Sequence, residues 1–226
     1  MYDGLLIDLG GTIVENKNVN FDNGVLAVYS HIQPQIDYDQ FLITFQKESS
    51  ILRNRDKIEI PFQAILKNVG NVLKIKYDCS IPEVEYIFAQ QYEYLEKIEG
   101  IDSILNYFSK QGKSVVILSN STFSGRTLQR QIENLGLSKY IKTIFSSADF
   151  LIRKPYREFF LQAIHMWNTN EKILYIGNDY YFDMYGGSQT NLQLCWYNPY
   201  KKTNEDNIPC IDIQHYHQLL QILERK

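Results

Sequence analysis

Cysteine is scarce in this chain of 226 residues. Its three cysteines, Cys79, Cys195 and Cys210, are far apart and odd in number, so a framework of paired disulfides is not expected. Cys195 lies in an apolar run typical of a buried strand, where a free thiol is the usual state. We therefore expect a reducing, cytoplasmic environment for this protein.

Long apolar runs and clusters of basic residues are also missing. No stretch approaches the roughly 20 apolar residues of a membrane-spanning helix, and the N-terminus lacks the charged and apolar regions of a signal peptide. The net charge is −3 and lysines and arginines do not cluster, which argues against a surface for nucleic acid or for a membrane. We expect a small-molecule partner, and a protein that is a monomer or a weak homodimer.

The composition is that of a folded, globular protein. Hydrophobic residues make up 44% of the chain and charged residues 22%, which excludes the low hydrophobicity of disordered chains. The length suits one core with a smaller accessory domain.

Short apolar runs typical of buried parallel strands alternate with helical patterns. The runs cover residues 5–7, 115–118, 143–145, 173–176, 194–197 and 210–213, and the helical patterns cover 101–110, 127–135 and 158–167. This alternation predicts an α/β fold with a Rossmann-like parallel sheet in a three-layer α/β/α core. Ligands of such sheets bind beyond the carboxyl ends of the strands.

The pattern changes between the first and second strand. Residues 15–97 contain apolar side chains at helical spacing, and Pro61 and Pro82 stand where first helical turns begin. We predict about four helices there and no strand. The predicted domains are thus a catalytic core of residues 1–14 and 98–226 and an inserted, all-helical cap of residues 15–97.

Four motifs follow predicted strands in a fixed order. They are Asp8-Leu9-Gly10-Gly11-Thr12, Ser119-Asn120, Lys154-Pro155, and Gly177-Asn178-Asp179 with Asp183 beyond it. In this order the motifs resemble those of the haloacid dehalogenase superfamily of hydrolases, and the resemblance covers nearly the whole chain.

The resemblance implies a phosphohydrolase with Asp8 as covalent nucleophile. Lys154 and Ser119 would be catalytic, and the implied substrate-binding residues are Gly11, Thr12, Ser119, Asn120 and Lys154. The implied ligands of Mg²⁺ are Asp8, Gly10 through its carbonyl, Asn178, Asp179 and Asp183. The substrate class implied is a small phosphorylated metabolite.

Two positions depart from the family pattern. Gly10 stands where the family has a second aspartate, and Asn178 stands where the first aspartate of the last motif falls in the commoner spacing. Under the shorter spacing of the family, Asp179 takes that place instead. These departures leave two alternatives open: a metal-independent 2-haloacid dehalogenase, and a catalytically weak or silent phosphate-binding or regulatory protein.

The stretch from Ile7 to Thr12 also resembles the phosphate loop of sugar kinases, but the later motifs follow the dehalogenase order. Arg53 and Arg55 are interpreted first as solvated charges on a helix, with contacts from the cap to the substrate as the alternative.

Overall fold

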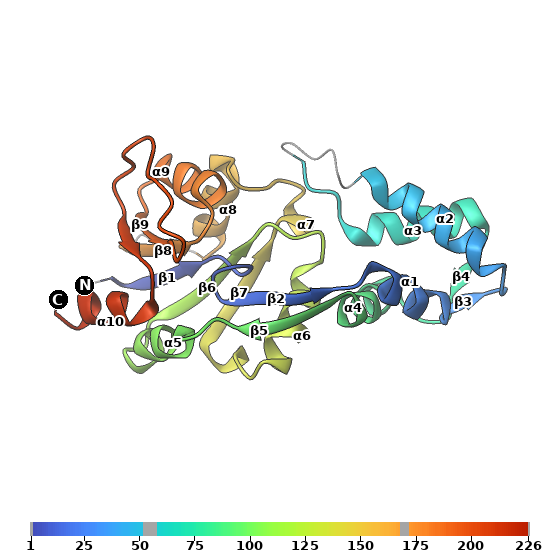
Figure 1. Ribbon diagram of the computed structural model, residues 1–226, viewed down its shortest axis with the longest axis horizontal. Coiled ribbons are helices and arrows are strands. Elements are labelled where there is room, and N and C mark those ends of the chain that lie inside the picture. The colour runs from blue at the N-terminus through green and yellow to red at the C-terminus, as the bar shows by residue number, and fades with distance from the viewer. Residues whose placement is uncertain (1, 52–57, 168–171, 226) are drawn as a thin grey trace.

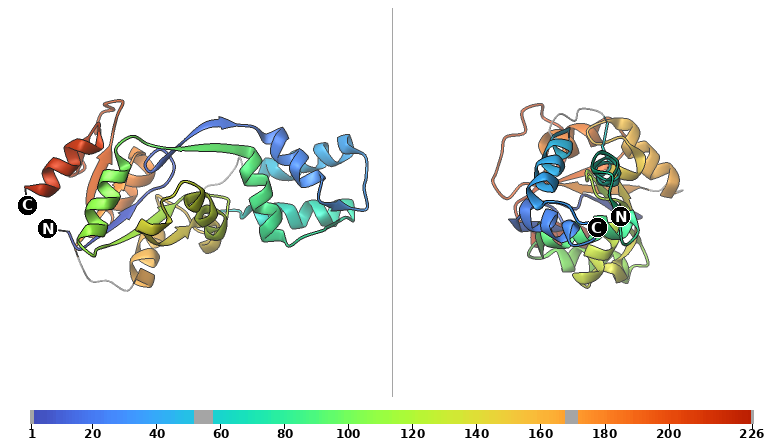
Figure 2. Two further views of the ribbon diagram at one scale, coloured as in Figure 1. Left: turned by 90° about the horizontal axis from the view of Figure 1, so that it is seen from below. Right: turned by 90° about the vertical axis from the view of Figure 1, so that its right-hand side faces the viewer.

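The computed structural model describes residues 2–51, 58–167 and 172–225. The molecule is elongated, with a sheet covered by helices at one end and a group of four helices at the other (Figures 1 and 2). The two chain termini lie at the end of the molecule that is far from the four helices.

The central sheet has six strands, all paired in parallel, in the order β10-β9-β8-β1-β6-β7. The strands are β1 (Gly4–Ile7), β6 (Ser114–Ser119), β7 (Ile141–Ser146), β8 (Ile173–Gly177), β9 (Gln193–Tyr197) and β10 (Ile211–Ile213). They confirm the six apolar runs of the sequence. Because β1 lies between β6 and β8, the carboxyl ends of these three strands meet at one edge.

Both faces of the sheet are covered by helices, which confirms the three-layer core. The helices of the core are α5 (Ile101–Lys110), α6 (Gly125–Asn134), α7 (Ser147–Phe150), α8 (Arg157–Trp167), α9 (Gly186–Ser188) and α10 (Tyr216–Glu224), with a 3-10 turn at Ser138–Tyr140 and a π-helical turn at Tyr180–Tyr185. Within the described segments no helix is long and apolar enough to span a membrane.

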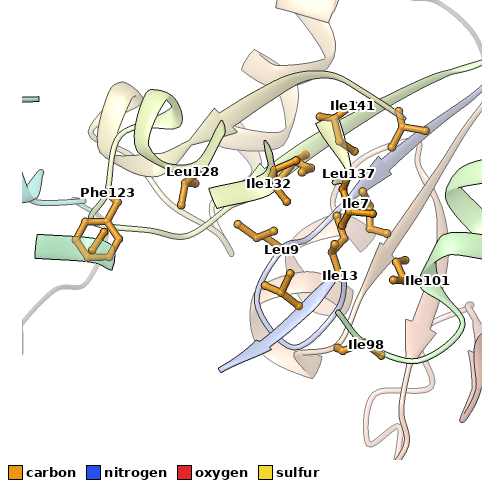
Figure 3. Packing of buried hydrophobic residues seen from close by; sticks show 14 of the residues in the cluster. Ile7, Leu9, Ile13, Ile98, Ile101, Phe123, Leu128, Ile132, Leu137 and Ile141 are labelled. Atoms are coloured by element: carbon orange, nitrogen blue, oxygen red, sulfur yellow. The ribbon is translucent and has the colours of Figure 1, made fainter. Parts of the chain in front are cut away.

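Successive residues of β1 alternate between two apolar clusters. Leu5 and Ile7 belong to the cluster that α5, α6 and α10 cover, whereas Leu6 belongs to the cluster that contains Phe159 and Phe160 of α8. Figure 3 shows Ile7, together with side chains of α5 and α6, in the first cluster. A strand that is buried on both faces has few polar residues, which is why its sequence is an unbroken apolar run.

The segment between β1 and α5 contains the four predicted helices, α1 (Phe21–Tyr29), α2 (Tyr38–Ser49), α3 (Phe62–Leu73) and α4 (Ile81–Tyr92). The expectation of no strand there was wrong. β2 (Val14–Val19) pairs antiparallel with β5 (Glu93–Lys97), and β3 (Ile32–Gln33) pairs antiparallel with β4 (Lys76–Tyr77). In β2 only Val14 is buried, so this strand has none of the apolar alternation that identifies strands in a sequence.

The β2–β5 ribbon carries the chain from the sheet to the four helices and back (Figure 1). A second connection is made by Glu85 of α4, which is fully buried. Its carboxylate accepts hydrogen bonds from Ser124 N at 3.1 Å, Ser124 Oγ at 2.5 Å and Thr127 Oγ1 at 2.8 Å. These contacts join α4 to the first turn of α6, where a negative charge is favourable.

Candidate active site

Asp8 directly follows β1 at the carboxyl edge of the sheet and is 5% exposed. Its Oδ1 accepts a hydrogen bond from Lys154 Nζ at 2.6 Å, and its Oδ2 accepts one from Thr12 Oγ1 at 3.1 Å. The first and third motifs of the sequence are therefore brought together across 146 positions of the chain.

Lys154 is buried among three oxygen atoms. Besides Asp8, its Nζ lies 2.6 Å from Asp183 Oδ1 and 3.1 Å from Tyr175 Oη. Tyr175 Oη donates to the same Asp183 oxygen at 2.5 Å. The other oxygen of Asp183 accepts hydrogen bonds from the backbone N–H groups of Asn178 and Asp179 at 3.1 and 2.9 Å. Asp183 thus orients Lys154 toward Asp8.

Burial and charge shift the ionisation of this group in opposite directions. Burial raises the pKa of Asp8 to about 6, even though the Lys154 ammonium lowers it, and the Asp183 carboxylate adds to the increase. Burial also acts to lower the pKa of Lys154, but the Asp183 and Asp8 carboxylates together outweigh it and the pKa is raised. Lys154 therefore remains a cation at neutral pH, beside a carboxyl group whose pKa is raised to about 6.

Ser119 is the last residue of β6 and Asn120 follows it; both line the same cavity as Asp8. The Asn120 side chain forms two hydrogen bonds with the backbone of Lys154: Nδ2 donates to the carbonyl oxygen at 2.9 Å, and the N–H group of Lys154 donates to Oδ1 at 2.8 Å. The structure thus gives Asn120 a positioning role, and its predicted contact with substrate stays a prediction. Ser119, 4% exposed, places its hydroxyl-bearing side chain beside the same cavity.

The two glycines after Asp8 differ in what they tolerate. A Cβ atom at Gly10 would meet no atom within 4 Å, and Gly10 is not among the glycines with positive φ. Gly11 has φ +76°, and a Cβ atom there would lie 2.4 Å from Asn178 Nδ2. Glycine is thus required at position 11 by backbone conformation and close packing, whereas at position 10 it leaves room for a side chain.

The predicted Mg²⁺ ligands of the last motif have other contacts as well. Asn178 Oδ1 accepts a hydrogen bond from Thr12 Oγ1 at 3.2 Å. Asp179 Oδ1 accepts one from Phe182 N at 2.7 Å, which caps the helical turn that follows. Asp183 is engaged with Lys154, Tyr175 and two backbone N–H groups, as described above. The metal role of these residues stays a prediction.

The oxygen atoms near Thr12 fit a hard cation. The Thr12 hydroxyl has one proton but faces two acceptors, Asp8 Oδ2 and Asn178 Oδ1. Oxygen lone pairs are thus in excess at this point, and carboxylate and amide oxygens are ligands that Mg²⁺ accepts. The set is poor in charge: in the described segments, no three histidine, cysteine or acidic groups come together at this site. The residues fit a weakly held cation.

The cavity at the carboxyl edge has a volume of about 530 Å³, within the range of sites for small molecules. Its walls include Asp8, Lys154 and Asn178, and it extends to the β2–β5 ribbon and α6. Arg53 and Arg55 lie outside the described residues, so the structure addresses neither interpretation of them.

Two residues of the site were not anticipated from the sequence. Tyr175 lies inside an apolar strand, and its hydroxyl reaches Lys154 and Asp183. Trp196 donates from Nε1 to the carbonyl oxygen of Asn178 at 3.0 Å. A tyrosine or tryptophan within a buried strand was a usable signal, because their polar atoms need partners when buried.

Comparisons with known proteins give the same family as the motifs. The model of the haloacid dehalogenase-like hydrolases matches residues 5–197. The HAD-hydrolase YfnB of Bacillus subtilis (strain 168) is 26% identical over 241 residues, which cover 98% of this chain and 95% of that protein.

Solved structures share the fold. A HAD phosphatase from Thermococcus onnurineus has a TM-score of 0.61 at 18% identity over 98% of this chain and 97% of its own. YfnB bound to magnesium has a TM-score of 0.57 at 21% identity over 98% of each chain. A 2-haloacid dehalogenase from Pseudomonas syringae pv. tomato has a TM-score of 0.64 at 17% identity over 100% of this chain and 99% of its own. With the match of the family model over most of its length, the chain belongs to the haloacid dehalogenase-like hydrolases.

Proposed function

We propose that this hydrolase is a phosphatase that acts on a small phosphorylated metabolite through an aspartyl-phosphate intermediate at Asp8. The observation that carries the proposal is the contact of the Asp8 carboxylate with the buried Lys154 ammonium, at the wall of a cavity of about 530 Å³. A cation beside the nucleophile is arranged to hold the anionic oxygens of a phosphoryl group.

In the first step an Asp8 oxygen forms a bond to phosphorus. The bond between phosphorus and the leaving oxygen breaks, and that oxygen takes the electron pair. In the second step the oxygen of a water molecule forms a bond to phosphorus and the bond between phosphorus and the Asp8 oxygen breaks. The Asp8 carboxylate is restored, and the protons of the water leave with the phosphate or pass to solvent. Lys154 and the Ser119 hydroxyl stabilise the phosphoryl oxygens throughout, and Asp183 keeps Lys154 in place.

Mg²⁺ is the proposed cofactor, held by the Asp8 carboxylate, the Gly10 carbonyl and Asn178. When bound, it would neutralise negative charge on the phosphoryl group. The relative YfnB has been described bound to magnesium. Because Asn178 brings no charge where an aspartate is expected, we propose that binding is weak and that activity requires about millimolar Mg²⁺.

In the family, an aspartate at the position of Gly10 supplies a carboxylic acid to the leaving oxygen. Glycine at this position supplies no such acid. An alkoxide leaves poorly without a proton, whereas a nitrophenolate or a carboxylate leaves readily as an anion. We therefore propose that aryl and acyl phosphates are hydrolysed faster than alkyl phosphates, since a general acid contributes about 10²–10⁴-fold.

A second candidate function is metal-independent dehalogenation of a 2-haloacid. It is favoured by the low charge of the donor set at Thr12, where Asp8 faces a neutral amide. In that reaction the Asp8 carboxylate would displace halide from carbon and form an ester that water hydrolyses.

One screen separates these functions. Phosphate release is measured over a panel of phosphorylated metabolites and nitrophenyl phosphate, with Mg²⁺ and with excess chelator, and halide release is measured with 2-haloacids. Release of phosphate that requires Mg²⁺ supports the proposal. Release of halide in chelator, without phosphatase activity, would establish the dehalogenase, and neither product would indicate a binding or regulatory protein.

A further inference from the structure

The cavity has a second polar wall, formed by residues outside the four motifs. We call Asn16 on β2, Glu93 at the start of β5 and Gln131 on α6 the distal wall; all three line the same cavity as Asp8. Gln131 Nε2 donates to Glu93 Oε1 at 2.8 Å, and Asn16 Nδ2 donates to Glu93 Oε2 at 3.0 Å. The wall is thus ordered by its own hydrogen bonds.

Gln131 presents an acceptor that lacks a donor. The residue is 7% exposed, and within the described part of the chain no donor reaches its Oε1. Rotating the amide to exchange oxygen and nitrogen would not help, because Nε2 is the atom that donates to Glu93. A buried acceptor without a donor costs about 1–3 kcal/mol. The oxygen is enclosed, and a small shift of the amide that opens it to the cavity would let a bound donor remove that cost.

Glu93 adds negative charge to the wall. Its partners Gln131 and Asn16 are both neutral amides, so neither compensates the charge of an ionised carboxylate. Burial raises the pKa of Glu93, while the hydrogen bond from Gln131 opposes the increase. A carboxylate in this environment favours a positively charged or hydrogen-donating neighbour.

The two ends of the cavity thus have opposite requirements. At the end with Asp8, the Lys154 ammonium suits an anion. At the distal wall, the free Gln131 oxygen and the Glu93 carboxylate suit a donor, and a second anionic group there would be repelled by Glu93. A ligand that satisfies both ends has a phosphate at one end and a hydroxyl or ammonium group at the other.

We propose that the distal wall binds a hydrogen-bond donor, an ammonium or hydroxyl group, on the leaving group of the substrate. The proposal rests on the proposed phosphatase function and narrows its substrates to small phosphate esters whose leaving group carries an amino or hydroxyl group away from the phosphate. Esters with a carboxylate or a second phosphate at that position are excluded as good substrates.

The test compares phenyl phosphates with matched arms in the para position. One series carries an alkyl arm, a second the hydroxyl analogue and a third the amino analogue, each lengthened one carbon at a time. At each arm length the three leaving phenols are of similar size. Differences in kcat/KM among them therefore reflect the group at the end of the arm. We expect a polar arm to exceed its alkyl match by about three- to tenfold at the length that reaches the wall, as expected for one hydrogen bond.

Gln131→Met should abolish this preference, because methionine has similar length and lacks the carbonyl oxygen. Gln129→Met is the matched control: Gln129 lies on the same helix and donates to Glu133 instead, so the preference should persist. Binding of the same esters to Asp8→Asn, measured by calorimetry, should show the same order without turnover. A preference for the ammonium arm over the hydroxyl arm would indicate that Glu93 is ionised, and the opposite preference would indicate that it is neutral. Either preference supports the proposed binding of a donor at the distal wall.

Two negative results are distinguishable. Equal kcat/KM for polar and alkyl arms at every length, with measurable turnover by the natural enzyme, would overturn the distal wall and leave the phosphatase intact. Phosphate release from none of the esters would contradict the phosphatase, and the distal-wall proposal with it.

Discussion

The Lys154 ammonium lies 2.6 Å from the Asp8 carboxylate, and both groups are buried. The contact does not return the pKa of Asp8 to its usual value, because burial still raises this pKa to about 6. The Asp8 carboxyl group, the proposed nucleophile, is therefore partly protonated under mildly acidic conditions, and this property can be measured.

The first prediction concerns pH. In the proposed mechanism only the carboxylate form of Asp8 attacks phosphorus. Its raised pKa moves the loss of this form to a higher pH than the usual range near 4. We expect kcat/KM to be constant above about pH 7 and to fall toward tenfold per pH unit below about pH 6. The raised pKa of Lys154 predicts no loss from that group near neutrality. The pH profile with nitrophenyl phosphate checks this, and constant activity down to about pH 4.5 would contradict it.

Asp183→Asn tests whether that carboxylate positions Lys154. Lys154 would lose one of its two charged partners, and we expect kcat to fall by about 10²-fold, as for other misplaced electrostatic groups. Asp183 also raises the pKa of Asp8, so its removal should move the acid limb of kcat/KM to lower pH. If the acid limb came from ionisation of the substrate instead, it would stay at the same pH in this variant. Asp206→Asn, at an exposed residue bonded to Tyr180, is the control and should change neither quantity.

Gly10→Asp tests the missing general acid. The structure leaves open space for a Cβ atom at Gly10 and shows no positive φ there, so the variant should fold. We expect hydrolysis of alkyl phosphates to rise by about 10-fold or more, and that of nitrophenyl phosphate to change little. Gly10→Asn is the matched control because it has the same shape without the acid. Equal effects of the two substitutions would argue against the proposed role of an acid at this position.

Asn178→Asp tests the metal site. It adds a negative charge beside Asp8 Oδ2, where the Thr12 hydroxyl already faces two acceptors. We expect the Mg²⁺ concentration for half-maximal activity to fall about tenfold or more, because a charge at close range contributes several kcal/mol. Calorimetric titration with Mg²⁺ should show the same change. Asn134→Asp at the end of α6, where the side chain donates to Tyr86 Oη, is the control and should leave it unchanged. An unaltered Mg²⁺ requirement in Asn178→Asp would exclude Asn178 as a ligand.

The core of the fold was predictable because its strands are buried on both faces. Runs such as 115–118 have no other simple interpretation than a buried element, and their order with the helices predicts a parallel sheet. β2 was not predictable: five of its six residues are partly or fully exposed, and its pairing with β5 joins positions that are far apart in the chain. Pairing of that kind depends on the folded arrangement rather than on local pattern.

The candidate site was predictable only in part. Asp8 and Lys154 were singled out by their motifs, and the structure brings them into contact. The contact from Asp183 to Lys154 was not foreseen, since an acidic residue after Gly177 was interpreted as a metal ligand. Glu93 and Gln131 carry no motif, and they become recognisable only when β5 and α6 are placed around one cavity. The motifs identify the residues proposed for the chemical step, whereas the proposed substrate-selecting wall is formed only in the tertiary structure.

The most direct test of the central claim is mass spectrometry of the enzyme after acid quenching during turnover of an aryl phosphate. The account predicts that the peptide containing Asp8 gains one phosphoryl group in the natural enzyme and that this peptide is unmodified in Asp8→Asn, which also releases no phosphate. Phosphate release by Asp8→Asn at a substantial rate, or a phosphoryl group trapped on another residue, would contradict it.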